Sequence, residues 1–187
     1  MKRLLIQFLL TILSVNLALG QGDPTAELKF TNVTITNVPN PYLGDWSAEI
    51  LSPGDIVTIK SPVKKHIPHD IMMMGGVMEY EGFEFANFNI PACDAFTDKA
   101  YGEDILKKGK PDGKFPKSCP VAPADYYEIY KYKVSTEKLP PAVPNGKFSG
   151  VITVYEKGKD PAYVKIEFDG TLSHKLPGVP GGLGIGG

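Results

Sequence analysis

Two histidines and an aspartate stand close together and offer side chains of the kind that bind zinc. His66 and His69 are three positions apart, and Asp70 follows directly. On a strand or a loop this spacing does not bring both imidazoles to one point, and His174 lies far along the chain. Because a structural zinc site needs four ligands, we interpret the segment as a solvated turn and expect no metal.

The familiar catalytic motifs do not occur in the sequence. It contains no G-x-S-x-G nucleophile elbow, no H-E-x-x-H zinc motif and no phosphate loop of the G-x-x-x-x-G-K type. The acidic residues are scattered among lysines, which is typical of a solvated surface. We therefore expect a protein that is not an enzyme and uses no cofactor.

A methionine cluster is the most informative group of side chains. Met72, Met73, Met74 and Met78 all fall within one short apolar run. Methionine is flexible and polarisable, so it suits surfaces that adapt to more than one shape, although ordinary core packing also explains such a cluster. Because side chains alternate along a strand, Met72 and Met74 lie on the face opposite Met73. One set is expected to line an interior.

The first twenty residues have the layout of a secretory signal peptide. Lys2 and Arg3 precede an apolar segment from 4 to 19, and Ala18 and Gly20 provide the small residues of a cleavage site. The alternative, an uncleaved anchor, needs about 20 predominantly apolar residues, and polar residues interrupt this run. We expect residues 1–20 to be removed and the protein to be secreted.

The composition is that of one ordinary globular domain. The chain has 187 residues, 42% of them hydrophobic, and a formal net charge of -1, which excludes a disordered chain and argues against nucleic-acid binding through a basic surface. Residues 21–176 are expected to form the domain. Residues 177–187 are rich in glycine and proline and are predicted to be a flexible tail.

Two features gain meaning once export is assumed. Cys93 and Cys119 are the two cysteines of the chain, and in an oxidising compartment a structural disulfide is favoured over a reactive thiol or a metal ligand. Asn32 begins an Asn-Val-Thr sequon, so it is a candidate glycosylation site.

Short apolar runs separated by proline and glycine turns predict an all-β domain. The one helix candidate, 94–108, is divided by Gly102. A change of alternation phase within 27–36 indicates a bulge or two short strands. We predict a mainly β protein, a single antiparallel β-cup or sandwich of about seven or eight strands with one short helix and an immunoglobulin-like layout. The strands are expected at 27–36, 48–51, 56–59, 71–80, 83–90, 126–134, 148–155 and 162–172.

The second half of the chain resembles a known family. The carrying segments are Phe115–Pro120 with its Cys-Pro, Tyr126-Tyr127, Glu137–Pro141 and Pro144–Phe148. Together they are similar to the ganglioside activator protein family and the related insect chemosensory CheB-type proteins, over about residues 90–172. The additional disulfides of the ganglioside activator are missing here, and the N-terminal half matches in strand rhythm alone.

The resemblance implies a fold, a pairing and a function. Cys93, followed by Asp94, matches the family cysteine that pairs with the Cys-Pro cysteine, so a Cys93–Cys119 bridge is implied. The implied fold is a lipid-recognition β-cup whose two sheets splay apart around an apolar cavity. The implied function is to bind lipid without catalysis, in lipid transfer or in the handling of chemosensory or pheromone ligands.

We assign the cavity by strand alternation, so a slip of one residue would reverse each set. The predicted wall comprises Met72, Met74, Phe83, Phe85, Ile129, Ile152, Val154, Val164, Ile166 and Phe168. The predicted rim comprises Trp46, Tyr130 and Tyr132. The expected partners are a lipid or small hydrophobic molecule and, transiently, a membrane surface. The alternatives are an extracellular protein-interaction module without a cavity and, less favoured, a secreted hydrolase.

Overall fold

The computed structural model describes residues 25–98, 102–136, 139 and 143–175. The predicted signal peptide and the predicted tail lie outside the described residues, as do parts of two loops. The described part of the chain is mainly β, with two antiparallel sheets, one short α-helix and one 3-10 turn. The predicted fold class is therefore confirmed.

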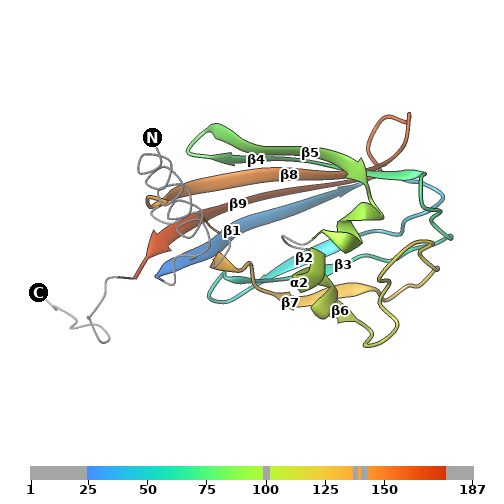
Figure 1. Ribbon diagram of the computed structural model, residues 1–187, viewed down its shortest axis with the longest axis horizontal. Helices are drawn as coiled ribbons and strands as arrows, with labels where there is room; N and C mark the ends of the chain where they lie inside the picture. The colour runs from blue at the N-terminus through green and yellow to red at the C-terminus, as the bar shows by residue number, and fades with distance from the viewer. Residues whose placement is uncertain (1–24, 99–101, 137–138, 140–142, 176–187) are drawn as a thin grey trace, which may run out of the picture.

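The larger sheet has five strands in the order β1-β9-β8-β4-β5, and every neighbouring pair is antiparallel. It forms one layer of the molecule, drawn above the other in Figure 1. Its strands are β1 (Ala26–Asn37), β4 (Met72–Tyr80), β5 (Phe83–Pro91), β8 (Gly146–Glu156) and β9 (Val164–His174).

The smaller sheet has four strands in the order β2-β3-β7-β6 and forms the second layer. The connection from β5 to β6 carries the 3-10 turn η1 and the helix α2, which begins at Gly102. The bounds are β2 (Ser47–Leu51), β3 (Ile56–Lys60), η1 (Asp94–Thr97), α2 (Gly102–Lys107), β6 (Gly109–Lys110) and β7 (Glu128–Tyr132).

Nine strands are present in the described residues, where about seven or eight were expected. The additional strand is β6, whose two residues are too short to show any alternation. The predicted break in β1 is confirmed as a single strand with a register shift: Phe30 lies opposite Gly170, and Asn32 lies opposite the next residue, Asp169. This bulge returns the apolar residues of both halves of β1 to one face.

A packed core closes one end of the sandwich. Its contributors from the larger sheet are Met72, Val154, Val164 and Ile166. The other members come from loops and from isolated bridges, in which Leu43 pairs with Val63 and Ile67 pairs with Val121. The buried cluster is Leu43, Val63, Ile67, Met72, Val121, Tyr127, Val154, Val164 and Ile166.

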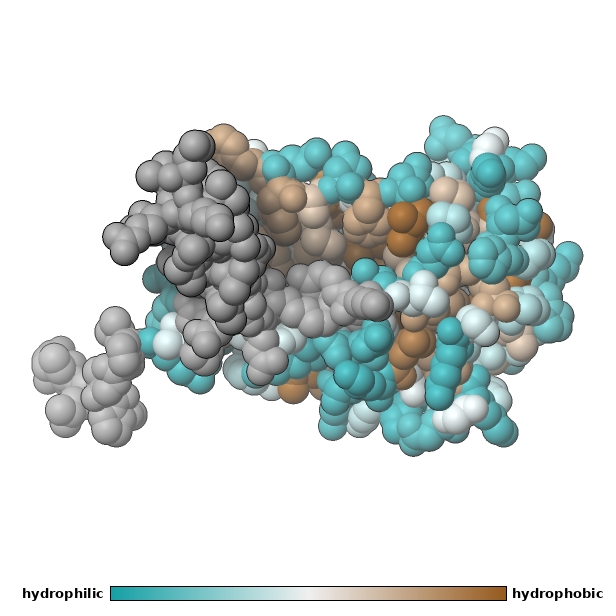
Figure 2. Space-filling model, in the orientation of Figure 1, coloured by the Kyte–Doolittle hydropathy of each residue, from teal (hydrophilic) through white to brown (hydrophobic). Residues whose placement is uncertain are grey.

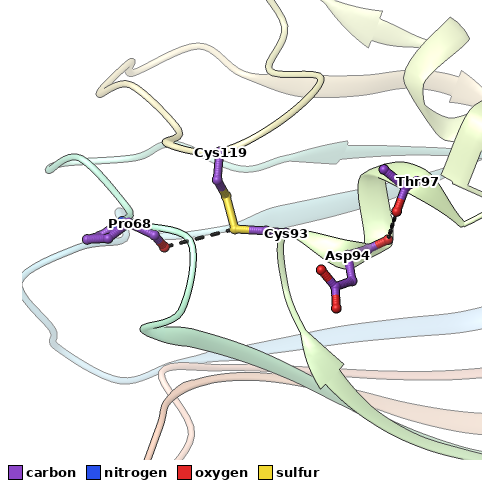
Figure 3. Close-up of a disulfide and its surroundings, with 5 residues drawn as sticks. All are labelled: Pro68, Cys93, Asp94, Thr97 and Cys119. Carbon is purple, nitrogen blue, oxygen red and sulfur yellow. Dashed lines mark hydrogen bonds between the residues drawn. A yellow bond between two sulfur atoms is a disulfide. The ribbon is translucent and has the colours of Figure 1, made fainter.

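A disulfide joins the two layers at this closed end (Figure 3). Cys93 follows β5 of the larger sheet, and Cys119 lies in the loop between β6 and β7 of the smaller one. Their Cα atoms are 5.8 Å apart, and the carbonyl oxygen of Pro68 lies 3.9 Å from Sγ of Cys93. The bridge implied by the family resemblance is therefore present in the structure.

Among the helices of the described residues, none is long and apolar enough to cross a bilayer.

Candidate functional site

The face of the larger sheet that meets the core continues beyond it as an apolar floor. Register and alternation place Phe148, Phe168 and Met78 on the same face as Val154 and Ile152. The residues in the core cluster are buried, whereas Phe148, Phe168 and Met78 are only half-buried. The sheets therefore pack tightly at one end and leave the floor partly uncovered further along.

Three glycines on this floor lie beneath phenylalanine rings from neighbouring strands. A Cβ atom placed on Gly150 would be 2.3 Å from the ring of Phe168, and one on Gly170 would be 2.1 Å from the ring of Phe148. At Gly76 the nearest ring atom, from Phe88, would be 2.3 Å away. Each ring thus occupies the space where a side chain would start.

A further ring, from Phe30, stands against this floor. Its plane makes angles of 83° with the ring of Phe148 and 80° with the ring of Phe168, at centroid distances of 5.7 and 6.0 Å. Edge-to-face pairs of this kind are favourable beyond the area that they bury. Phe30 of β1 thus contacts both phenylalanine rings of the floor.

The smaller sheet offers an apolar face of its own. Ile50, Val57 and Ile59 share one face, and Glu49 is exposed on the other. Ile129 of β7 pairs with Ile59 and is half-buried. In a two-layer sandwich the apolar faces turn toward each other, so these side chains lie opposite the phenylalanine floor.

Figure 2 shows the consequence at the surface. Apolar residues, in brown, are visible in a hollow between polar rims on the face that carries β5 and α2. An apolar recess that the protein does not fill favours hydrocarbon over water.

The tip of the β4–β5 hairpin presents two large apolar side chains to solvent. Phe83 is 77% exposed and Phe85 is 63% exposed. The turn is built on Glu81 and Gly82, both with positive φ, and the amide of Glu81 donates to the carbonyl of Lys147 at 2.9 Å. The hairpin is thus tied to β8, and its phenylalanines are held outward.

Polar groups are few on the inner side of the sandwich. Trp46 packs against the core cluster, and its Nε1 is buried without a hydrogen-bond partner. The side-chain amide of Asn37 fixes the backbone of Trp46 with two hydrogen bonds of 2.9 Å: its Nδ2 donates to the Trp46 carbonyl, and its Oδ1 accepts from the Trp46 N–H. Near the closed end, the hydroxyl of Tyr163 donates to Glu156, and this bond raises the pKa of Tyr163 to about 12.

No cluster of three or more His, Cys, Asp or Glu in the described residues could hold a metal ion. His66 and His69 are exposed. A shallow depression of about 260 Å³ lies mostly on the outer face of the larger sheet, where Glu79, Glu167 and Asp169 surround it, away from the recess.

Several predicted wall residues need correction. Met72, Val154, Val164 and Ile166 lie on the predicted face but belong to the closed core, because the bridges at Val63 and Ile67 bring the loops down onto that end. Phe83 and Phe85 lie in the β4–β5 hairpin and are both exposed, so their place in the wall stays a prediction. Met74, Ile129, Ile152 and Phe168 are half-buried on the apolar faces.

Two of the predicted rim residues are less exposed than the third. Trp46 is half-buried against the core because Asn37 anchors its backbone, and Tyr132 is buried opposite Val57. Tyr130 is exposed, with the ammonium group of Lys131 over its ring at 5.0 Å. Its place at the rim stays a prediction.

Phe148, Met78 and Phe30 were the main omissions from the wall predicted from the sequence. Phe148 has the same alternation phase as Ile152 and could have been included on that ground. Phe30 was hidden by the bulge in β1, which shifts the phase of the strand. The pairs of glycine and phenylalanine depend on the register between strands, which a single sequence does not give.

The comparisons add a family match over the middle of the chain. Residues 77–149 match the sequence model of a family described as "Protein of unknown function (DUF1091)". The matched part runs from β4 to the start of β8 and includes both cysteines of the disulfide. No curated protein matches the chain.

Proposed function

We propose that this protein is a secreted carrier that holds a lipid or another small hydrophobic molecule between its two sheets, without catalysis. The observation that carries the proposal is the half-buried floor of Phe148, Phe168 and Met78 beyond the closed core. Burying hydrocarbon there contributes about 0.8 kcal/mol per methylene before association costs. A carrier of this kind needs no reacting group.

The hairpin tip supports a role at membranes. Phe83 and Phe85 form an outward apolar pair at the tip of the β4–β5 hairpin. Aromatic side chains insert readily at a bilayer interface. We propose that the tip touches the membrane when the ligand is loaded or delivered.

Two further features support export. The disulfide fits an oxidising compartment, and residues 1–20 have the pattern of a signal peptide. Asn32 is exposed on β1, so its side chain is accessible for a glycan. We propose that the mature protein is extracellular and that Asn32 is glycosylated.

The family resemblance favours the same function. The Cys-Pro loop, the paired tyrosines and the Pro-x-Gly strand start resemble those of ganglioside activator and CheB-type proteins. Lipid transfer and the handling of chemosensory ligands are both uses of such a β-cup. Either use depends on the recess.

The direct test compares two neighbouring residues on opposite faces of β4. Met78 lies on the floor, and Val77 lies on the outer face. Met78→Asp places a charge in the recess and should weaken uptake of a fluorescent polyene fatty acid by more than about tenfold, since an unpaired charge in an apolar site is costly. Val77→Asp should leave uptake unchanged.

The outcome separates the carrier from its alternatives. Folding of both variants is checked by circular dichroism and by secreted yield. Equal uptake by Met78→Asp and wild type, with both folded, would place the probe elsewhere and contradict the proposed site. Absence of uptake by wild type would favour the interaction module.

A further inference from the structure

The three glycines of the floor share one kind of neighbour, as does Gly109 of β6, whose Cβ would lie 2.2 Å from the ring of Phe115. Gly76, Gly150 and Gly170 each lie under a phenylalanine of the adjacent strand. Gly75 lies beside Gly76 but on the opposite face, where a Cβ would meet the hydroxyl of Thr153 at 3.0 Å and a ring atom of Tyr155 at 3.8 Å, which is ordinary contact. In the larger sheet, the three close approaches of a phenylalanine ring to a glycine therefore lie on the face that lines the recess.

The consequence is a thin floor. Ordinary contact between carbon atoms begins at 3.4 Å, so a Cβ on Gly150, at 2.3 Å, would displace the ring of Phe168 by about 1.1 Å. The strands on both sides hold the backbone by continuous pairing. The ring can therefore move only away from the sheet, into the recess.

We propose that Gly76, Gly150 and Gly170 are specificity-determining residues that set the thickness of the hydrocarbon that the recess admits. Without side chains, they let the tips of the rings approach the sheet backbone closely, which leaves height above the rings. The inference rests on the proposed function, because it assigns the depth of that same recess. It predicts that thick fused-ring molecules are more sensitive to the floor than single chains are.

The alternative explanation is that these pairs of glycine and phenylalanine serve only to stabilise the fold. A phenylalanine over a cross-strand glycine protects backbone that would otherwise be exposed, and such pairs stabilise sheets. That role predicts lower thermal stability after substitution but no selective change in binding. Affinity and melting temperature must therefore be measured on the same samples.

The experiment uses the full secreted chain and two probes, a fluorescent polyene fatty acid and a fluorescent sterol. Gly150→Ala is compared with the control Gly75→Ala. For the probe that wild type binds more tightly, Gly150→Ala should weaken affinity by about tenfold, as overpacking does, and Gly75→Ala should stay within about twofold of wild type. Where both probes bind, the sterol should lose more.

A second substitution tests the mechanism in the opposite direction. Phe168→Leu removes the ring from above Gly150, so it should restore binding to Gly150→Ala and, on its own, should tighten sterol binding by about threefold. If Gly150→Ala is not secreted, Gly76→Ala beneath Phe88 takes its place, and the single Phe168→Leu variant still gives a result.

The two ways of failing are distinct. Folded Gly150→Ala that binds like Gly75→Ala, or Phe168→Leu that binds like wild type, would overturn the role of the floor glycines while leaving the carrier intact. Wild type that binds neither probe would instead refute the proposed function.

Discussion

Removal of the disulfide gives a prediction whose size follows from the chain. The bridge joins Cys93 and Cys119, which are 26 positions apart. In the chain-entropy treatment, a disulfide that closes a loop of this length lowers the conformational entropy of the unfolded chain. This stabilises the folded state by about 3.5 kcal/mol. Both cysteines become serine in the variant, so that no free thiol remains. For a domain of this size, the melting temperature should fall by about 10 °C.

The assay is urea unfolding of the secreted protein, followed by intrinsic fluorescence. Wild type should lose the same free energy of unfolding when a reductant is added, and the double Cys93→Ser/Cys119→Ser variant should not respond to the reductant. This matched pair separates the bridge from other effects of serine. A loss below about 1 kcal/mol in both comparisons would show that the link between the layers is not what stabilises the closed end.

The remaining predictions concern a titration and the hairpin tip. The hydrogen bond to Glu156 needs the protonated phenol of Tyr163, and it raises the pKa of Tyr163 to about 12 from 10.0, so its stabilisation is full below pH 10 and lost as pH rises toward 12. Tyr163→Phe should abolish that alkaline loss in thermal melts, and an unchanged pH profile would contradict the assignment. Phe83→Ser/Phe85→Ser should slow lipid transfer between vesicles by about tenfold without lowering affinity for the free probe. Tyr126→Ser, exposed elsewhere, is the control; equal slowing by both would rule out a special role for the tip.

Much of the fold could be predicted because it is encoded locally. Alternation located the long strands of the larger sheet, and the phase change in 27–36 correctly indicated the bulge of β1. Gly102 was correctly placed as a break, and it proves to be the first residue of α2. These features depend only on neighbours in the chain.

The site was predicted less well because it depends on where the two sheets separate. Alternation put Val154 and Phe168 on one face, as found, but it could not show that the first is in the packed core and the second is on the open floor. Phe85 lies at a register shift in the β4–β5 hairpin and is 63% exposed. Such differences come from tertiary packing, which no local pattern records.

The most direct test of the central claim is native mass spectrometry of the secreted protein, purified without detergent. We expect a species heavier than the protein chain by the mass of a bound lipid, which organic extraction releases for identification. We also expect Met78→Asp to be secreted without this adduct. Protein that carries no extractable hydrophobic molecule, together with a crystal structure in which its own side chains fill the space above Phe148 and Phe168, would contradict it.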